Sequence, residues 1–402
     1  MTSPHPTAAG DSAGVGVTAA RGFRAAGIAA GIKASGAPDL ALVINDGPAR
    51  AAAGVFTANR VKAAPVLWSE QVLKAGHLSA VVLNSGGANA CTGPLGFQDT
   101  HATAERAAEA LGLDAAEIAV ASTGLIGVRL PMDKLLPGID AAAAELSEHG
   151  GQDAAVAIKT TDTVHKTAVH RTAAADGTGW TVGGMAKGAG MLAPSLATML
   201  VVLTTDADVD APGLDAALRA ATRTTFDRVD SDGCMSTNDT VLLLASGASR
   251  VRPAQHEFAE AVRAVCADLA RQLVGDAEGA GKDIRIDVVG AHSEAEAVEV
   301  ARSIARNNLL KCAIHGEDPN WGRVLAAIGT TGAAFEPDAL DVAINGVWVC
   351  RAGSVGEDRE LVSMKDRDVV ITADLHAGDA AATVWTNDLT ADYVHENSAY
   401  SS

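Results

Sequence analysis

The sequence predicts an α/β or α+β protein, built as a layered sandwich of mixed sheets and helices. Short runs of Val, Ile, Leu and Ala alternate along the chain with Ala-rich stretches, a pattern typical of interleaved strands and helices. Of the 402 residues 48% are hydrophobic, which is enough for a substantial core, but only 3% are aromatic. The core must therefore consist mainly of aliphatic side chains. No fixed-period repeat indicates a solenoid.

In the first half of the chain, three short apolar runs predict buried strands and two Ala-rich stretches predict helices. The strands are expected at residues 40–44, 80–83 and 118–121, and the helices at 100–111 and 135–146. A polar, Gly-rich break at 148–151 is expected to be a surface loop.

The second half alternates more regularly. Strands are expected at 199–204 and 239–245, a helix at 213–224, and alternating strands over 368–386. The clearest helix has apolar residues three or four apart on one face, namely Phe258, Val262, Val265, Leu269 and Leu273. Another helix opens at Ser293, because Glu296 three residues later completes a capping box.

Charge and composition exclude several classes of function. The 31 basic and 49 acidic residues give a net charge of −18, which would repel phosphate backbones, so we expect no nucleic-acid partner. No apolar run is long enough for a membrane span, and the N-terminal residues lack the pattern of a signal peptide. Five cysteines without a CxxC pair favour a reducing cytoplasm.

Phosphate and metal sites are also disfavoured. The glycines before Lys282 resemble a P-loop, but Asp276 occupies the first required Gly position and Asp283 follows the lysine. His165 and His170 lack a third ligand nearby, so they are interpreted as surface histidines rather than a zinc site. We therefore expect neither a metal nor another cofactor.

The segment from Gly183 to Leu200 contains two residues, a lysine and a threonine, that could take part in catalysis. Lys187 lies in a Gly-rich, otherwise apolar run, and a buried ammonium needs a partner. Eleven residues later, Thr198 precedes a strand that is expected to be buried. One interpretation is an ordinary threonine in a Gly-rich strand–loop–strand. The other is a nucleophile, because a threonine at a new N-terminus has its own α-amine as base.

Several blocks favour the second interpretation. The run KGAGMLAPSLATML, ending at Leu200, closely resembles the autoprocessing site of the ornithine acetyltransferase (ArgJ) family, also called bifunctional glutamate N-acetyltransferases. Further blocks follow in family order and cover nearly the whole chain: NSGGANACTG (84–93), ASTGLIG (121–127), TTDT (160–163), STNDT (236–240), DPNWGR (318–323) and ENSAYSS (396–402).

The resemblance implies a set of site residues. It implies self-cleavage between Ala197 and Thr198, after which the Thr198 hydroxyl carries the acetyl group. It assigns the oxyanion hole to Thr123 and Gly124, where preset donors stabilise the developing charge. The implied substrate-binding residues are Thr160, Lys187, Thr198, Glu278, Asn397 and Ser402. Lys187 would pair with a carboxylate and Glu278 with the cationic side chain of acetylornithine.

The resemblance also implies the reaction and the partners. Acetyl would pass from N2-acetylornithine to L-glutamate by a ping-pong route in the cyclic arginine pathway. Residues 1–197 and 198–402 would form α and β chains, and two of each would make a heterotetramer. Whether acetyl-CoA is a second donor, giving an amino-acid N-acetyltransferase activity, stays open. The alternatives are an N-terminal-nucleophile amidase or peptidase of related layered fold and a non-enzymatic binding protein.

The sequence departs from the family at two positions outside the implied site. The family often has Asn where this chain has Gly87, and often Thr where it has Gly281. The second departure lies close to Glu278.

Overall fold

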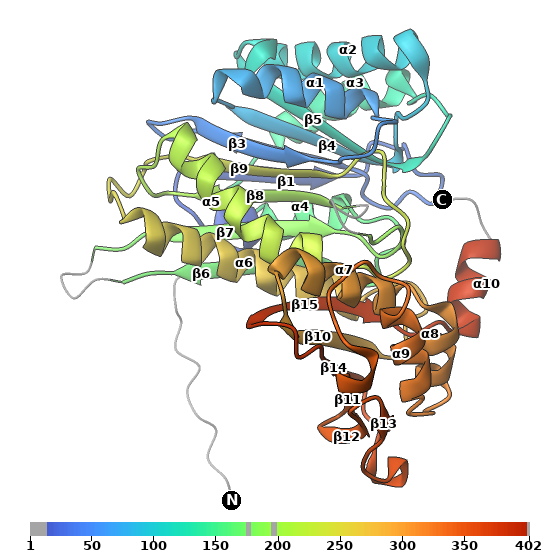
Figure 1. Cartoon of the computed structure of the whole chain (residues 1–402). Helices are drawn as coiled ribbons and strands as arrows, with labels where there is room; N and C mark the ends of the chain where they lie inside the picture. The colour runs from blue at the N-terminus through green and yellow to red at the C-terminus, as the bar shows by residue number, and fades with distance from the viewer. Residues whose placement is uncertain (1–13, 174–177, 194–198, 400–402) are drawn as a thin grey trace, which may run out of the picture.

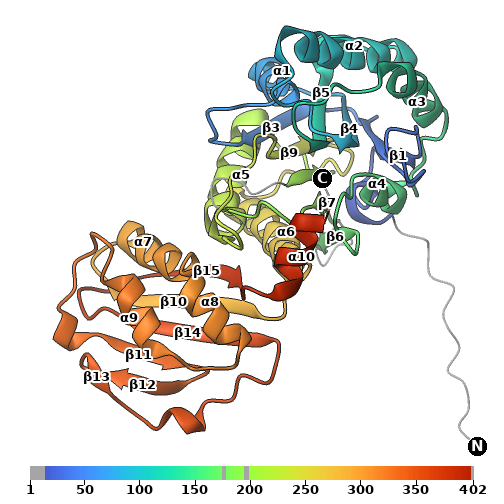
Figure 2. The ribbon, with the colours of Figure 1, turned by 90° about the vertical axis from the view of Figure 1, so that its right-hand side faces the viewer.

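The computed structural model describes residues 14–173, 178–193 and 199–399 (Figure 1). Two stacked sheets with helices on both outer faces make one body, and a third sheet with its own helices makes a second body below it (Figures 1 and 2). The predicted layered sandwich of mixed sheets and helices is confirmed. No helix in these ranges is long and apolar enough to cross a membrane.

The first sheet has the order β1-β2-β4-β5. Its strands are β1 (Phe23–Ile28), β2 (Leu40–Asn45), β4 (Ala80–Gly87) and β5 (Ile118–Leu125). The helices α1 (Ala64–Val72), α2 (Gly93–Leu111) and α3 (Met132–Ala144) lie on its outer side (Figure 1). The pairing of β4 with β5 is parallel, so the carboxyl ends of both strands meet at one edge.

The second sheet has the order β3-β9-β8-β7-β6. Its strands are β3 (Ala51–Phe56), β6 (Lys166–Arg171), β7 (Thr181–Lys187), β8 (Leu200–Thr205) and β9 (Thr240–Ala245). The helices α5 (Ala211–Thr224) and α6 (Gln255–Gly275) cover its outer face. Alternation along β8 explains why both faces are buried: Leu200 and Val202 point to the inner core, Val201 and Leu203 to the helices.

The space between the two sheets holds α4 (Gly151–Ala157). The expectation of a surface loop at 148–151 is wrong for its two glycines, which are buried. A Cβ on Gly150 would lie 1.9 Å from the Ala25 carbonyl oxygen, and one on Gly151 would lie 2.0 Å from that of Val15. These glycines therefore let α4 begin directly against the neighbouring backbone.

The third sheet has the order β13-β12-β11-β14-β10-β15. Its strands are β10 (Asp283–Ala291), β11 (Asp341–Ile344), β12 (Val347–Arg351), β13 (Ser354–Val355), β14 (Asp368–Asp374) and β15 (Ala380–Asn387). The helices α7 (Glu294–Ala305), α8 (Asn308–His315) and α9 (Trp321–Ile328) pack with it into a separate core. From β15 the chain returns towards the first body through α10 (Ala391–Ala399) (Figure 2).

Most of the expected elements are present, with shifted ends. The helices expected at 100–111 and 135–146 begin earlier, at Gly93 and Met132. Ser293 caps α7 as expected, since its hydroxyl accepts the Glu296 N–H. The division expected after residue 197 stays a prediction, and it falls between two antiparallel neighbours in the second sheet, β7 and β8.

Candidate active site

A cavity of about 270 Å³ lies where β5, β7, the loop after α6 and α10 meet. Its lining residues are Thr123, Gly124, Leu125, Ile126, Thr160, Thr161, Lys187, Gly190, Met191, Glu278 and Asn397. Six positions that the family resemblance implied therefore line one cavity: Thr123, Gly124, Thr160, Lys187, Glu278 and Asn397.

The end of β5 brings Thr123 and Gly124 to one side of this cavity. Thr123 is 1% exposed, and Gly124 has a φ of 129°, which disfavours any residue with a side chain. A Cβ on Gly124 would also lie 2.5 Å from the Gly87 nitrogen on the adjacent strand. Glycine at position 124 therefore lets β5 run this close to β4 beside Thr123.

Lys187, the last residue of β7, supplies a buried ammonium. Lys187 is 2% exposed, and its Nζ lies 3.8 Å from Oδ2 of Asp162. Burial is the main reason why the pKa of Lys187 lies below its ordinary value, while the Asp162 carboxylate acts in the opposite direction. This buried ammonium can therefore pair with a carboxylate.

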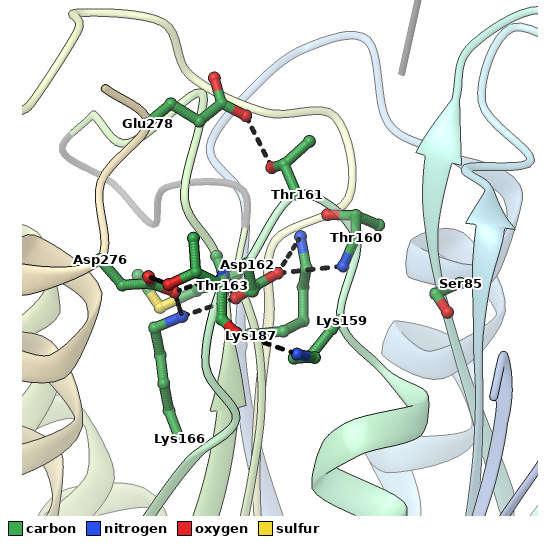
Figure 3. Close-up of polar contacts among 12 residues, drawn as sticks. Ser85, Lys159, Thr160, Thr161, Asp162, Thr163, Lys166, Lys187, Asp276 and Glu278 are labelled. Atoms are coloured by element: carbon green, nitrogen blue, oxygen red, sulfur yellow. Dashed lines mark hydrogen bonds and ion pairs between the residues drawn. The ribbon is translucent and has the colours of Figure 1, made fainter. Parts of the chain in front are cut away.

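Asp162 neutralises two lysines at once (Figure 3). Its Oδ1 lies 2.7 Å from Nζ of Lys166 and accepts the Gly188 N–H at 2.6 Å, while Oδ2 accepts the Thr160 N–H at 3.0 Å. Burial alone would raise the pKa of Asp162, but Lys187, Lys166 and these hydrogen bonds hold it well below its usual range. This network fixes the ends of β6 and β7 and the loop that carries Thr160.

Glu278 faces the same cavity from the loop after α6. Its N–H donates to the Ala189 carbonyl at 3.0 Å. Its Oε1 accepts the Thr161 hydroxyl at 2.6 Å, and its Oε2 accepts Nδ2 of Asn397 on α10 at 2.9 Å (Figure 3 shows the first of these side-chain bonds). The cavity thus presents a carboxylate and an ammonium on different elements.

Three implied site residues, Ala197, Thr198 and Ser402, lie outside the described residues. Met199, which follows Thr198, is fully buried and held on both sides of its backbone. Its N–H donates to Oδ1 of Asp239 at 3.1 Å, and its carbonyl accepts the Thr240 N–H at 3.1 Å.

Sequence reasoning did not single out Thr161, Asp162 or Gly190. The first two lie within the TTDT block that carried the resemblance, but the sequence does not show that Asp162 faces Lys187, 25 positions away. Gly190 lies against the Glu278 carboxylate, because a Cβ there would be 2.5 Å from Oε2 of Glu278 and would displace it.

Lys282, which was considered for phosphate binding, has partners within the protein. Nζ of Lys282 donates to the carbonyls of Asp366, at 3.0 Å, and Met364, so this lysine joins loops rather than binding phosphate. Among the described residues no group of His, Cys, Asp or Glu could hold a metal ion.

The two departures from the family pattern lie in tight places. A Cβ on Gly87 would lie 2.7 Å from Cδ2 of Leu130, and one on Gly281 would lie 2.9 Å from Oδ2 of Asp388. The Gly281 N–H donates to Oδ1 of Asp388 at 2.8 Å, which ties the loop after Glu278 to the end of β15. The local geometry near Glu278 is therefore well anchored.

Comparison with known proteins places these features in a family. Residues 24–402 match the family model described as the ArgJ family. A relative from Streptomyces avermitilis is 78% identical over 386 residues, which are 96% of this chain and 100% of that protein. One from Mycobacterium tuberculosis is 58% identical over 395 residues, 96% of each chain. Both are named arginine biosynthesis bifunctional protein ArgJ.

Solved structures match over about half of this chain. An ornithine acetyltransferase from Mycobacterium tuberculosis, complexed with ornithine, is 62% identical and covers 46% of this chain and 96% of its own, with a TM-score of 0.43. An ArgJ protein from Bacillus halodurans is 37% identical and covers 49% of this chain and 97% of its own, with a TM-score of 0.47.

Proposed function

This chain belongs to the ArgJ family, and we propose that it transfers acetyl from N2-acetylornithine to L-glutamate in arginine biosynthesis. The observation that carries the proposal is the single cavity lined by Thr123, Gly124, Thr160, Lys187, Glu278 and Asn397. Relatives with this name, 78% and 76% identical over 96% of the chain, support an acetyltransferase over an amidase or peptidase.

The charges of the cavity fit the donor. N2-acetylornithine carries an α-carboxylate at one end and a side-chain ammonium at the other. Lys187 would hold the carboxylate, since its own counter-ion Asp162 is 3.8 Å away and already shared with Lys166. Glu278 would hold the ammonium, and the hydrogen bonds from Thr161 and Asn397 fix the direction of its carboxylate.

Self-cleavage would create the nucleophile. The Thr198 hydroxyl would attack the carbonyl carbon of Ala197, and the C–N bond would break as the Thr198 nitrogen takes up a proton. Water would then hydrolyse the resulting ester, leaving a carboxylate on Ala197 and a free hydroxyl and α-amine on Thr198. Because β7 and β8 pair along six positions, the two pieces would stay together in one sheet.

Acetyl transfer would repeat this chemistry with small molecules. The Thr198 amine would take the hydroxyl proton as the oxygen attacks the acetyl carbonyl, and ornithine would leave with that proton on its nitrogen. The Thr123 hydroxyl and the Gly124 N–H would stabilise the oxyanion, and each such donor typically lowers the barrier by about 3 to 4 kcal/mol. The amine of glutamate would then take the acetyl group and free the hydroxyl.

The remaining expectations belong to the same proposal. Two copies of each piece would form a heterotetramer in the cytoplasm, and no metal or other cofactor would take part. The test is to incubate the purified protein with N2-acetylornithine, with and without L-glutamate, and to measure ornithine, N-acetylglutamate and acetate. Ornithine and N-acetylglutamate in equal amounts support the transferase, whereas acetate formed in place of N-acetylglutamate would show a hydrolase.

A further inference from the structure

Asn238 and Asp239, which lie side by side just before β9, each hold a different part of the proposed catalytic centre. Nδ2 of Asn238 donates to the carbonyls of Ser122, at 2.8 Å, and Ala88, at 2.6 Å. Oδ1 of Asp239 accepts the Met199 N–H at 3.1 Å. Neither side chain lines the cavity, so any effect on the reaction must act through these backbone contacts.

Each contact holds one backbone group. The Ser122 carbonyl and the Thr123 N–H belong to the same planar peptide unit. Asn238 therefore sets the direction of the peptide that leads to the proposed oxyanion donors at residues 123 and 124. Asp239 in turn fixes the backbone N–H of Met199, the first described residue after position 198.

Burial makes both contacts rigid. Asn238 is 3% exposed and Asp239 is fully buried. The Oδ1 of Asn238 also accepts the Thr237 hydroxyl at 2.6 Å, so both ends of this side chain are occupied. Besides accepting the Met199 N–H, the Asp239 carboxyl group interacts with the side chains of Ser236 and Thr57, so it is held from several sides.

We propose that Asn238 and Asp239 are positioning residues: Asn238 orients the peptide that leads to the proposed oxyanion donors at residues 123 and 124, and Asp239 fixes Met199, the residue that follows the proposed nucleophile. The inference rests on the proposed acetyl transfer and extends it. Adjacent residues thus hold Ser122 and Met199, each of which is the chain neighbour of a proposed reacting group, so a shift of either contact would disturb the proposed catalytic centre. A misplacement of about 1 Å can lower a rate about 100-fold.

The test compares variants that keep or remove each contact. Asp239→Asn keeps an acceptor oxygen for the Met199 N–H. Asp239→Leu removes that acceptor and keeps a side chain of similar size. Burial raises the pKa of Asp239 well above its usual range, so a neutral amide should fit there without loss of stability. Asn238→Asp turns an oxygen towards two carbonyl oxygens and repels both.

The expected results separate positioning from folding. Asp239→Asn should keep kcat within about threefold, whereas Asp239→Leu and Asn238→Asp should lose about 100-fold in kcat with little change in KM. The Thr240 N–H, which donates to the Met199 carbonyl, should exchange faster in Asp239→Leu and at an unchanged rate in Asp239→Asn, as measured on a peptide that begins several residues before Thr240. Rates are taken per cleaved molecule, and thermal unfolding reports folding.

The control is Thr204→Val in β8, the strand that also contains Leu200. It removes a buried hydrogen bond of 2.8 Å from the Thr204 hydroxyl to the Val17 carbonyl. It should lower the unfolding temperature but keep kcat. The inference is overturned if Asp239→Leu or Asn238→Asp keeps the wild-type kcat, or if Asp239→Asn is as impaired as Asp239→Leu. Should the Leu variant not fold, Asn238→Asp and Asp239→Asn decide. A wild-type protein that makes no N-acetylglutamate would instead remove the proposed function itself.

Discussion

Replacing Gly190 by alanine should weaken binding of the donor through Glu278. The backbone accepts this change, because Gly190 is not in the left-handed region. The new Cβ, however, would lie 2.5 Å from Oε2 and 2.7 Å from Cδ of Glu278, where ordinary contact begins at 3.4 Å. The carboxylate must therefore retreat by about 1 Å, away from the Thr161 hydroxyl and the Asn397 amide.

The size of the effect follows from these two hydrogen bonds. Each involves a charged acceptor, and such bonds contribute about 1.5 to 3 kcal/mol. Part of this energy fixes the carboxylate that would meet the donor's ammonium, so we expect a loss of about 1.4 kcal/mol or less in donor binding. KM for N2-acetylornithine should then rise by up to about tenfold, with kcat much less affected.

The assay is steady-state kinetics with N2-acetylornithine as the varied substrate, scored per cleaved molecule. The matched control is Gly275→Ala, three residues before Glu278. A Cβ on Gly275 would meet only Oδ2 of Asp283, at 3.8 Å. The control should keep the wild-type KM. An unchanged KM in Gly190→Ala would refute the reasoning, as would an equal rise in both variants.

Three further variants test charges in the same cavity. Glu278→Gln keeps the shape of the side chain and removes its charge, so KM for N2-acetylornithine should rise about tenfold while thermal unfolding stays the same; an unchanged KM would leave Glu278 a structural role. Lys187→Met removes a cation that we expect to lower the pKa of the proposed Thr198 α-amine, so the acid limb of the pH–rate profile should move to higher pH, towards the reference of about 7.7 to 8.0. A limb that does not move in the cleaved variant would limit Lys187 to carboxylate binding. Asp162→Asn leaves the buried Lys187 without its counter-ion, while Lys166 keeps Asp276 at 2.6 Å, so urea unfolding at pH 7 should show a loss of about 3 kcal/mol. Since the folded-state pKa of Asp162 is lowered, its stabilisation is present above about pH 4 and is lost as the pH falls below that value, so the variant's stability should depend less on pH in acid. Equal stability of variant and wild type at pH 7 would contradict this account of the network.

Local periodicity predicted the elements with one clear apolar face. The helix containing Phe258 and Leu273 and the strands near 200 and 240 are where the pattern placed them, because their packing partners need only be apolar. The burial of Gly150 and Gly151 was not predictable in this way. It depends on how closely α4 approaches the backbone of β1 and of the segment before it, which sequence spacing does not contain.

The candidate site was predictable through the blocks of the family, not through physics alone. Nothing local indicates that Glu278 meets Thr161 across 117 positions, or that Asp162 lies beside Lys187. These contacts depend on the order of strands in the second sheet and on the return of α10. Asn238 and Asp239 lay within a quoted block, but their roles became visible only once their backbone partners were known.

The measurement that tests the central claim most directly is the mass of the denatured protein, before and after incubation with N2-acetylornithine alone. We expect two pieces, residues 1–197 and 198–402, with the second piece gaining the mass of one acetyl group on Thr198. Thr198→Ala should give one uncleaved chain that takes up no acetyl. A wild-type chain that transfers acetyl while remaining uncleaved, or an acetyl group carried by another residue, would contradict the account.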